Sequence, residues 1–312
     1  MGELKIVGMG PGDRDGMTIA ADQAIREADV VVGYKRYVQL LAPLYPGKSF
    51  CSTGMTHEVA RCNQALELAQ SGRLVAMVCS GDAGVYAMAG LVYELSPRFP
   101  DVTIEVVPGV TAATSGAALL GAPIGHDFAV VSLSDRLTGW PVIERRLDAA
   151  AGADFLICLY NPSSHTRAGH LRRACDVLLR HKPATTVCGL ASRIGRDGQS
   201  ATVTTLGELR EVAADMFTTV FIGNAETVVI DGKMVTPRGY ATDFRHSDAN
   251  TDSLCPDADT DSCHSDANNI SRHSARSAEP SPARPRSTLP RHSARSAEPS
   301  TNRRLVREGG GR

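Results

Sequence analysis

The chain has 312 residues, 42% of them hydrophobic, and a formal net charge of −1. This length holds two domains of ordinary size with buried cores, and the balanced charge excludes a general nucleic-acid binder, so any basic site must be local. No apolar run approaches the roughly 18 to 20 residues of a membrane span, and the first residues lack a signal-peptide profile, so we expect a cytoplasmic protein with no membrane or nucleic-acid partner.

The eight cysteines predict neither a disulfide framework nor a metal site. Six of them are dispersed in or beside apolar segments, which is typical of small core residues. Cys255 and Cys263 lie in a polar region without the CxxC spacing of a metal-binding motif. The six dispersed cysteines are Cys51, Cys62, Cys79, Cys158, Cys175 and Cys188.

The first predicted strand, residues 4–7, leads into a glycine-rich loop, Gly8-Met9-Gly10-Pro11-Gly12-Asp13. The loop is not a dinucleotide fingerprint, because Asp13 replaces the third glycine and Pro11 interrupts the turn. Asp29, the only acid at a suitable distance, precedes the next apolar run instead of ending it. No GK[ST] sequence follows, so a P-loop is absent as well. We expect a rigid loop whose backbone a ligand can approach closely.

Residues 18–29 have the apolar periodicity of an amphipathic helix, with Thr18 as a candidate N-cap. The next apolar run, residues 30–32, predicts a strand. This strand delivers Gly33-Tyr34-Lys35-Arg36-Tyr37 to the same edge of the sheet. A positive pair between two aromatic residues fits an anion-binding site or a solvated helix start, and the sequence leaves both open.

An unbroken apolar run at residues 74–79 follows a predicted helix at 56–70 and indicates a buried parallel strand. The strand ends at Ser80-Gly81-Asp82, and apolar residues at helical spacing predict a helix from near Gly84. In open α/β sheets, ligands bind at such turns after the carboxyl end of a strand. An ordinary turn capped by Asp82 is the alternative.

A further strand is predicted at residues 103–107, before a helix start made of small residues, Pro108-Gly109-Val110-Thr111-Ala112-Ala113. Such a helix start lets a ligand lie against the backbone. Gly121-Ala122-Pro123 then interrupts the pattern, and we place the domain boundary there. The expected domains are an N-terminal α/β domain, residues 1–122, and a C-terminal α/β domain, residues 123–240.

Strands and helices alternate in the second half as well. The last strands follow one another closely, which favours a sheet of mixed strand direction. The fold expected for the chain is α/β, with two α/β domains facing each other across a ligand cleft. The predicted strands of this half are 128–132, 154–159, 185–189, 201–205, 218–222 and 227–230, and its predicted helices are 141–150 and 165–180.

The C-terminal tail, residues 241–312, has few large apolar side chains and contains the decamer RHSARSAEPS twice, at 272–281 and 291–300. Such a segment buries too little surface to offset its chain entropy. We predict a low-complexity, disordered tail, with weak anion or nucleic-acid contact as a further possibility.

Five motifs, in this order and spacing, resemble the tetrapyrrole methylase superfamily. Four segments further resemble its precorrin-3B C17-methyltransferase branch, which belongs to cobalamin biosynthesis. The resemblance covers residues 1 to about 240, and Ala83 departs from the proline that many members carry after Gly-Asp. The five motifs are 8–13, Ser80-Gly81-Asp82, 107–112, Tyr160-Asn161-Pro162 and 218–223; the branch segments are 33–37, 79–90, 132–138 and 159–162.

The resemblance implies an S-adenosylmethionine-dependent methyltransferase that forms a homodimer and converts precorrin-3B to precorrin-4 by C17 methylation with ring contraction. It implies that the methyl donor lies in the cleft, held mainly by small residues and backbone groups. The residues it assigns to the donor are Pro11, Gly81, Asp82, Ala83, Val85, Tyr86, Thr111, Ala112, Asn161, Ala191 and Thr219.

The implied acceptor is a macrocycle with many carboxylates. The planar guanidinium group of arginine can donate two hydrogen bonds to one carboxylate. Basic residues on loops expected at the cleft edge are therefore candidate substrate contacts, with an exposed surface charge as the alternative for each. They are Lys35, Arg36, Arg136, Arg193 and Arg196.

Ring contraction needs a hydroxyl proton to move and a developing carbonyl to be stabilised, which an acid or base would assist. Ser134, Asp135 and Asp82 are the candidate catalytic residues, although Asp82 could instead only fix its loop.

Four alternatives stay open. The acceptor could carry cobalt, as in cobalt-precorrin-3, or could be ribosomal RNA or a translation factor. The 22 Lys and Arg against 24 Asp and Glu in residues 1–240 argue against RNA. The chain could also be a non-catalytic nucleotide-binding module.

Overall fold

The computed structural model describes residues 2–164 and 167–240. The described residues lie in one compact unit, which contains two lobes, each built on a five-stranded sheet. The predicted tail, residues 241–312, lies outside the described residues. None of the described helices is long and apolar enough to cross a membrane.

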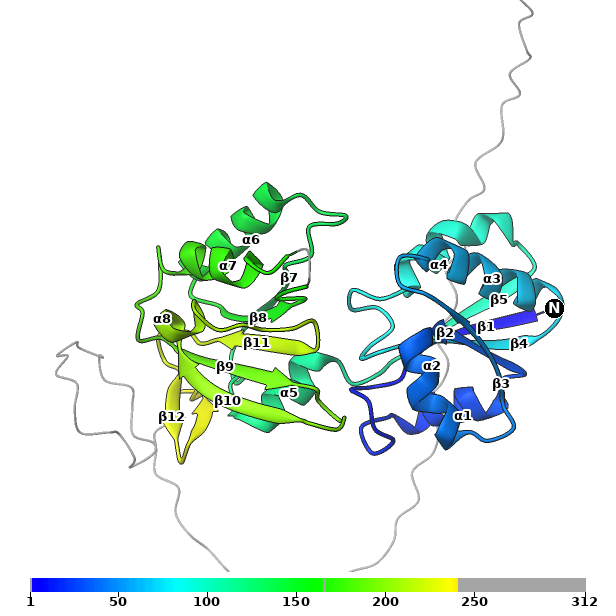
Figure 1. The fold of residues 1–312 in the computed structure, drawn as a ribbon, viewed down its shortest axis with the longest axis horizontal. Helices are drawn as coiled ribbons and strands as arrows, with labels where there is room; N and C mark the ends of the chain where they lie inside the picture. The colour runs from blue at the N-terminus through cyan, green and yellow to red at the C-terminus, as the bar shows by residue number, and fades with distance from the viewer. Residues whose placement is uncertain (1, 165–166, 241–312) are drawn as a thin grey trace, which may run out of the picture. The chain divides into compact units, whose positions relative to one another are not determined.

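The first lobe contains a parallel sheet (Figure 1). Its strands are β1 (Gly2–Gly8), β2 (Val30–Tyr34), β3 (Ser49–Thr53), β4 (Leu74–Cys79) and β5 (Val102–Val107), in the order β3-β2-β4-β1-β5. Every neighbouring pair in this sheet is parallel. Its helices are α1 (Ile19–Glu27), α2 (Lys35–Leu41), α3 (Glu58–Gln70) and α4 (Ala89–Leu95), with the short 3₁₀ helices η1 (Ala42–Leu44) and η2 (Ser96–Arg98).

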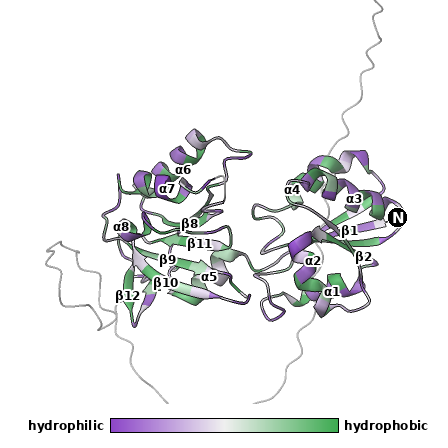
Figure 2. Cartoon of the chain, in the orientation of Figure 1, coloured by the Kyte–Doolittle hydropathy of each residue, from purple (hydrophilic) through white to green (hydrophobic). Residues whose placement is uncertain are grey.

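Helices cover both faces of this sheet, which explains why its central strands are continuously apolar. In β4, Val75 and Met77 pack with α3 and α4, whereas Ala76 and Val78 pack with α1 and α2. Figure 1 shows the two pairs of helices on opposite faces. Figure 2 shows hydrophobic colouring along the strands and mixed colouring on the helices, as expected when only one side of each helix is buried.

The second lobe contains a sheet of mixed direction, as predicted. Its strands are β7 (Phe128–Ser132), β8 (Leu156–Tyr160), β9 (Val187–Ser192), β10 (Ser200–Thr205) and β11 (Thr218–Ile222), in the order β10-β9-β11-β8-β7. Strands β7 and β8 are parallel, whereas β11 runs antiparallel to β8 and β9. Helix α5 (Ala112–Leu120) packs on one face, and α6 (Trp140–Gly152), α7 (His170–Leu178) and α8 (Leu206–Leu209) pack on the other.

A small separate sheet joins β6 (Gly121–Ala122), β12 (Val228–Ile230) and β13 (Lys233–Val235). The strand expected at 227–230 therefore pairs here and not in the main sheet. The expected boundary at Gly121-Ala122-Pro123 stays a prediction. Helix α5 precedes that point and packs on the second sheet, where Phe221 lies against Gly116.

Two helices begin later than predicted. Helix α4 begins at Ala89 instead of near Gly84. The preceding segment cannot be helical, because Tyr86 has a φ of +54° and its hydroxyl donates to the carbonyl oxygen of Val130 at 2.9 Å. Helix α7 begins at His170 and not at residue 165.

Candidate active site

Three glycine-containing loops meet at the carboxyl edge of the first sheet. Gly10 and Gly81 exchange backbone hydrogen bonds, with N–O distances of 3.1 and 2.7 Å. A Cβ atom on Gly109 would lie 2.2 Å from the Gly81 oxygen and 2.4 Å from the Gly8 oxygen. Only glycine therefore fits at position 109, and the loops after β1, β4 and β5 form a close-packed junction.

Asp82 holds two of these loops together. Its Oδ1 accepts the N–H of Gly84 at 2.8 Å, and its Oδ2 accepts the N–H of Gly109 at 3.0 Å. Both carboxylate oxygens are thus used within the protein. This arrangement favours the loop-fixing role that the sequence left open for Asp82 over a role as acid or base.

Beside this junction lies a pocket of about 200 Å³ lined by both lobes. It brings together nine of the residues assigned by resemblance to the methyl donor. They are Pro11, Gly81, Asp82, Val85, Tyr86, Thr111, Ala112, Asn161 and Thr219. The other two, Ala83 and Ala191, are fully buried and do not line the pocket; Ala191 lies opposite Thr219 in the pairing of β9 with β11.

Two of the five predicted substrate residues, Arg193 and Arg196, line the same pocket. Lys35, Arg36 and Arg136 are exposed and do not line it. The Cζ atom of Arg36 nevertheless lies 5.9 Å from the ring centroid of Phe217, which is a pocket residue.

Arg196 is held across the two lobes. Its Nε donates to the Pro11 carbonyl at 3.1 Å, and its Nη2 donates to Ser80 Oγ at 2.9 Å. Burial lowers the pKa of Arg196. No Asp or Glu within the described residues forms an ion pair with it. The pocket thus presents a cation with neutral hydrogen-bond partners, which suits an anionic ligand group.

Four aromatic side chains that the resemblance did not assign also line the pocket: Tyr34, Tyr37, Tyr160 and Phe217. The Tyr160 hydroxyl lies 2.6 Å from Thr111 Oγ1 and accepts the N–H of Ala113 at 2.6 Å. Tyr160 therefore fixes the start of α5 at the end of β8. Tyr34 and Tyr37 flank the basic pair Lys35 and Arg36 in the sequence. This pattern was the sequence signal that could have identified the two tyrosines as pocket residues.

The predicted catalytic residues Ser134 and Asp135 do not line this pocket. They follow β7, and the connection to the pocket runs through Asn161, whose Nδ2 donates to Ser132 Oγ at 2.9 Å. Asp135 Oδ2 lies 3.6 Å from His170 Nε2.

Arg167, which sequence reasoning missed, also contacts this loop. Its Nη1 donates to Ser134 Oγ at 3.2 Å and lies 3.9 Å from Asp135 Oδ1. Nothing in its sequence context distinguished it from the other basic residues near α7. The Asp135 carboxylate is therefore flanked by two basic side chains, Arg167 and His170.

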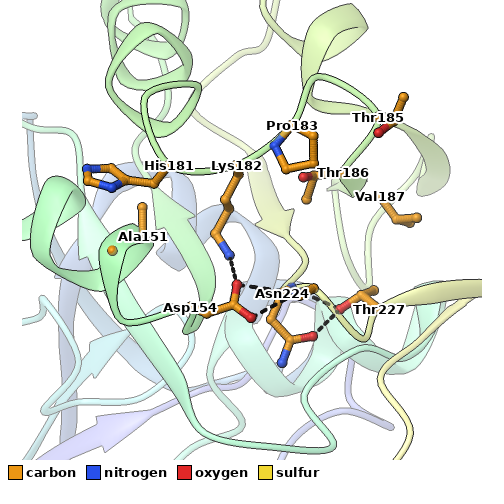
Figure 3. Close-up of a pocket in the computed structure, with 12 residues that line it drawn as sticks. Ala151, Asp154, His181, Lys182, Pro183, Thr185, Thr186, Val187, Asn224 and Thr227 are labelled. Atoms are coloured by element: carbon orange, nitrogen blue, oxygen red, sulfur yellow. Dashed lines mark hydrogen bonds and ion pairs between the residues drawn. The ribbon is translucent and has the colours of Figure 1, made fainter. Parts of the chain in front are cut away.

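A larger cavity of about 430 Å³ lies elsewhere in the second lobe (Figure 3). Its buried Lys182 points to Asp154, with 2.6 Å between Nζ and Oδ1, and Asp154 also accepts the N–H of Ala225. Asn224 and Thr227 bond to each other. These polar groups satisfy one another and lie away from the glycine junction, so we assign the site to the smaller pocket.

No group of three or more His, Cys, Asp and Glu is placed to hold a metal ion in the part of the chain that the structure describes. The described cysteines are free, and all except Cys51 are buried. Burial raises the pKa of Cys79, at the end of β4, to about 11, so its thiol is protonated at neutral pH.

Two α/β lobes with a pocket lined by strand-end loops define a class of ligand-binding α/β enzymes. The chain matches the model of the tetrapyrrole (corrin/porphyrin) methylases over residues 3–210. It belongs to this family.

A probable cobalt-factor III C(17)-methyltransferase of Salmonella typhimurium is 49% identical over 238 residues, which cover 76% of this chain and 99% of that protein. The crystal structure of the methyltransferase CobJ is similar with a TM-score of 0.71 and 36% identity, over 76% of this chain and 100% of that one. A uroporphyrin-III C-methyltransferase from Thermus thermophilus, complexed with S-adenosyl homocysteine, has a TM-score of 0.58 and 23% identity, over 71% of this chain and 97% of that one, and shares the fold.

Proposed function

We propose that this protein transfers a methyl group from S-adenosylmethionine to C17 of a tetrapyrrole in cobalamin biosynthesis, and that ring contraction accompanies the transfer. The observation that carries the proposal is the 49% identity over nearly the full length of the Salmonella typhimurium relative. The pocket supports it, because nine residues that the resemblance assigns to the methyl donor line it.

The lining of the pocket fits this donor. S-adenosylmethionine carries a sulfonium cation and a nucleoside but no phosphate, so it needs shape and aromatic surface more than counter-charge. Small residues such as Gly81 and Ala112 let a ligand approach the backbone. The rings of Tyr86 and Tyr160, which contact each other with centroids 5.7 Å apart, give the pocket aromatic surface. When bound, the donor supplies a methyl carbon whose bond to sulfur breaks as the bond to C17 forms.

The protein's own contribution to methyl transfer is to position the reactants. Thr111 and Tyr160 fix the start of α5, and Asp82 fixes the loops after β4 and β5. Preorganised binding of two reactants can lower a barrier by about 7 to 11 kcal/mol. We therefore assign these residues to orientation and require no base for the displacement itself.

Arg193 and Arg196 are the proposed contacts to peripheral carboxylates of the acceptor, because both line the pocket. Lys35, Arg36 and Arg136 are proposed as outer contacts that attract the acceptor before it docks. The name of the Salmonella typhimurium relative favours a cobalt-bearing acceptor of the cobalt-factor III class. Metal-free precorrin-3B, expected from the sequence, is the alternative.

For ring contraction we propose Ser134 and Asp135 as the residues that hold or move a proton. Ser134 lies two hydrogen bonds from the pocket, because its backbone N–H and Nδ2 of the pocket residue Asn161 both donate to Ser132 Oγ. Asp135 follows Ser134 in the chain. Arg167 and His170 keep the Asp135 side chain in place.

The test is to incubate the full chain with S-adenosylmethionine and either cobalt-factor III or precorrin-3B, and to follow products by mass spectrometry. We expect S-adenosylhomocysteine and a tetrapyrrole that has gained one methyl group on C17. Donor binding without methylation of either acceptor would refute the proposal and favour a binding module.

We also propose a homodimer that works in the cytoplasm, which rests on the family resemblance. Light scattering after size-exclusion chromatography tests the dimer, and cell fractionation tests the cytoplasmic location. A monomer, or a protein found outside the cytoplasmic fraction, would contradict them.

A further inference from the structure

Arg61 is a buried arginine in the first turn of α3, and no part of the proposed mechanism uses it. Only 4% of its surface is exposed. Its Nε donates to Thr53 Oγ1 at 3.0 Å, and its Nη2 donates to the Gly54 carbonyl at 3.1 Å. Both acceptors are neutral, and both lie where β3 ends.

Arg61 has no acidic partner within ion-pair distance among residues 2–164 and 167–240. Buried cations usually pair with an acidic side chain. Lys182, which is equally buried, does so, with 2.6 Å between its Nζ and Asp154 Oδ1. Removing a cation from water without a counter-charge is costly, and an apolar side chain of similar size would be cheaper. Because an unpaired buried cation is not explained by stability, its place next to a ligand pocket points to a role in binding.

Arg61 lies behind one wall of the pocket. Its Cζ is 5.9 Å from the ring centroid of Tyr34, and the rings of Tyr34 and Tyr37 meet edge to face at 5.2 Å. We call this pair the tyrosine wall; both members line the pocket, as does Arg196.

Two positive charges act on the tyrosine wall. Burial is the largest influence on Tyr37 and raises the pKa of its phenol, whereas the charges of Arg196 and Arg61 oppose that rise. Arg61 also acts on Cys79 at the end of β4. The Arg61 charge therefore acts on groups at the carboxyl ends of β2, β3 and β4, which form the edge of the sheet beside the pocket.

We infer that Arg61 is a specificity-determining residue, whose buried charge acts with Arg196 to select a carboxylate group of the acceptor at the tyrosine wall. This inference rests on the proposed tetrapyrrole acceptor, which carries such carboxylates around its ring. Arg61 acts through Tyr34 and the local potential, so it positions the acceptor and is not itself catalytic. An acceptor with neutral substituents at this point loses the attraction of both cations.

The competing explanation is that Arg61 only anchors residues 53 and 54. Arg61→Gln separates the two roles, because the amide keeps a donor for this loop and removes the charge. Arg61→Lys keeps the charge and alters the hydrogen-bond geometry. Lys182→Gln is the matched control, since it removes a buried cation far from the pocket.

The first readout is binding of uroporphyrin, a porphyrin rich in carboxylates, measured by fluorescence quenching with the full chain. We expect Arg61→Gln to weaken binding about tenfold and to flatten its salt dependence, and Arg61→Lys to bind within about twofold of wild type. Coproporphyrin, which has fewer carboxylates, should show a smaller difference between wild type and Arg61→Gln. The second readout is steady-state kinetics, where Arg61→Gln should raise the acceptor KM and leave kcat and the KM for S-adenosylmethionine unchanged.

Lys182→Gln should lower the unfolding temperature without changing porphyrin binding. The inference is overturned if Arg61→Gln binds uroporphyrin like wild type. It is also overturned if this variant loses stability together with affinity for both uroporphyrin and S-adenosylmethionine. Equal losses for Arg61→Lys and Arg61→Gln would overturn it as well. Arg61→Met, which fills the space with an apolar chain, is the second variant; if neither Gln nor Met folds, the role of Arg61 is structural and the inference fails.

The binding readout keeps this test separate from the proposed function. Absence of methyl transfer by the wild-type protein would refute the proposed function. Unchanged porphyrin binding by folded Arg61→Gln would refute only the role of Arg61.

Discussion

Two aspartates, Asp82 in the pocket lining and Asp135 outside it, differ in what their carboxylates bond to. Asp82 uses both oxygens to join Gly84 and Gly109, whereas Asp135 is partly exposed and faces His170 and Arg167. A carboxylate with free access can exchange a proton with a substrate, and one that accepts two backbone N–H groups is committed to structure. This difference makes Asp135 the better candidate for ring contraction.

The first prediction concerns Asp135→Asn. We expect ring contraction to slow by about 100-fold, because the amide cannot exchange a proton, while the dissociation constant for S-adenosylmethionine stays the same. Product analysis by mass spectrometry and calorimetric titration of the donor measure the two effects. Asp148→Asn is the matched control, since Asp148 also pairs with a histidine, His181, at 2.8 Å. Equal losses in donor binding and in contraction would contradict a catalytic role.

Among the elements, the loops after β1, β4 and β5 matter most, because their mutual contact forms the floor of the pocket. Gly81 has a φ of +69°, in the left-handed region that glycine tolerates, and Gly109 has no room for a Cβ. The parallel order β4-β1-β5 brings these three loops to one edge.

The second prediction compares two glycines. Gly109→Ala should lower the free energy of unfolding by about 3 kcal/mol or more, because its methyl group would overlap the Gly81 and Gly8 carbonyls. Gly90→Ala, in α4, meets nothing within 4 Å and should raise that free energy by about 0.5 to 1 kcal/mol. Urea unfolding measures both. Similar effects at the two positions would contradict the packing described for the loop junction.

The third prediction concerns helix α1 at low pH. The Arg26 guanidinium, helped by the Tyr45 hydroxyl, holds the pKa of Asp22 below its ordinary value of 3.8. Because the pKa is lower in the folded state, the stabilisation is present above pH 3.8 and is lost as the pH falls through the folded pKa. Asp22→Asn should lower the free energy of unfolding by about 1 kcal/mol at pH 6, and by progressively less as the pH is lowered below 3.8. Unfolding in urea between pH 6 and 3 measures this, and a cost that does not depend on pH would contradict it.

For the whole molecule, the two lobes depend on each other to complete the pocket. Arg196, from the second lobe, bonds to Pro11 and Ser80 of the first, and Tyr86 of the first lobe bonds to Val130 of the second. A ligand in this pocket contacts both lobes, so its binding energy should stabilise the whole compact unit.

The fourth prediction follows from that dependence. S-adenosylmethionine at about 100 times its dissociation constant should raise the free energy of unfolding by about 2.7 kcal/mol. Thermal unfolding should show one transition that moves upward with donor concentration. If two transitions appear and only one responds, the donor binds within a single lobe.

The sequence by itself predicted the α/β class, most of the strands and the residues of the strand-end loops. Apolar runs and glycine positions are local signals, so Leu74–Cys79 and the loop at Gly81 could be recognised without knowing their neighbours. The edge strand Ser49–Thr53 was missed, because its sequence SFCST contains two adjacent apolar residues among hydroxyl residues and so lacks both an apolar run and an alternating pattern.

Only the tertiary structure decided which of these residues face one another. It separated Ser134 and Asp135 from the pocket, engaged both oxygens of Asp82, and placed Arg61 of α3 behind Tyr34 of β2. Periodicity shows which side of a helix or strand is buried, but strand order and register determine the neighbours that this side meets. Those neighbours come from distant parts of the chain, and no local pattern contains them.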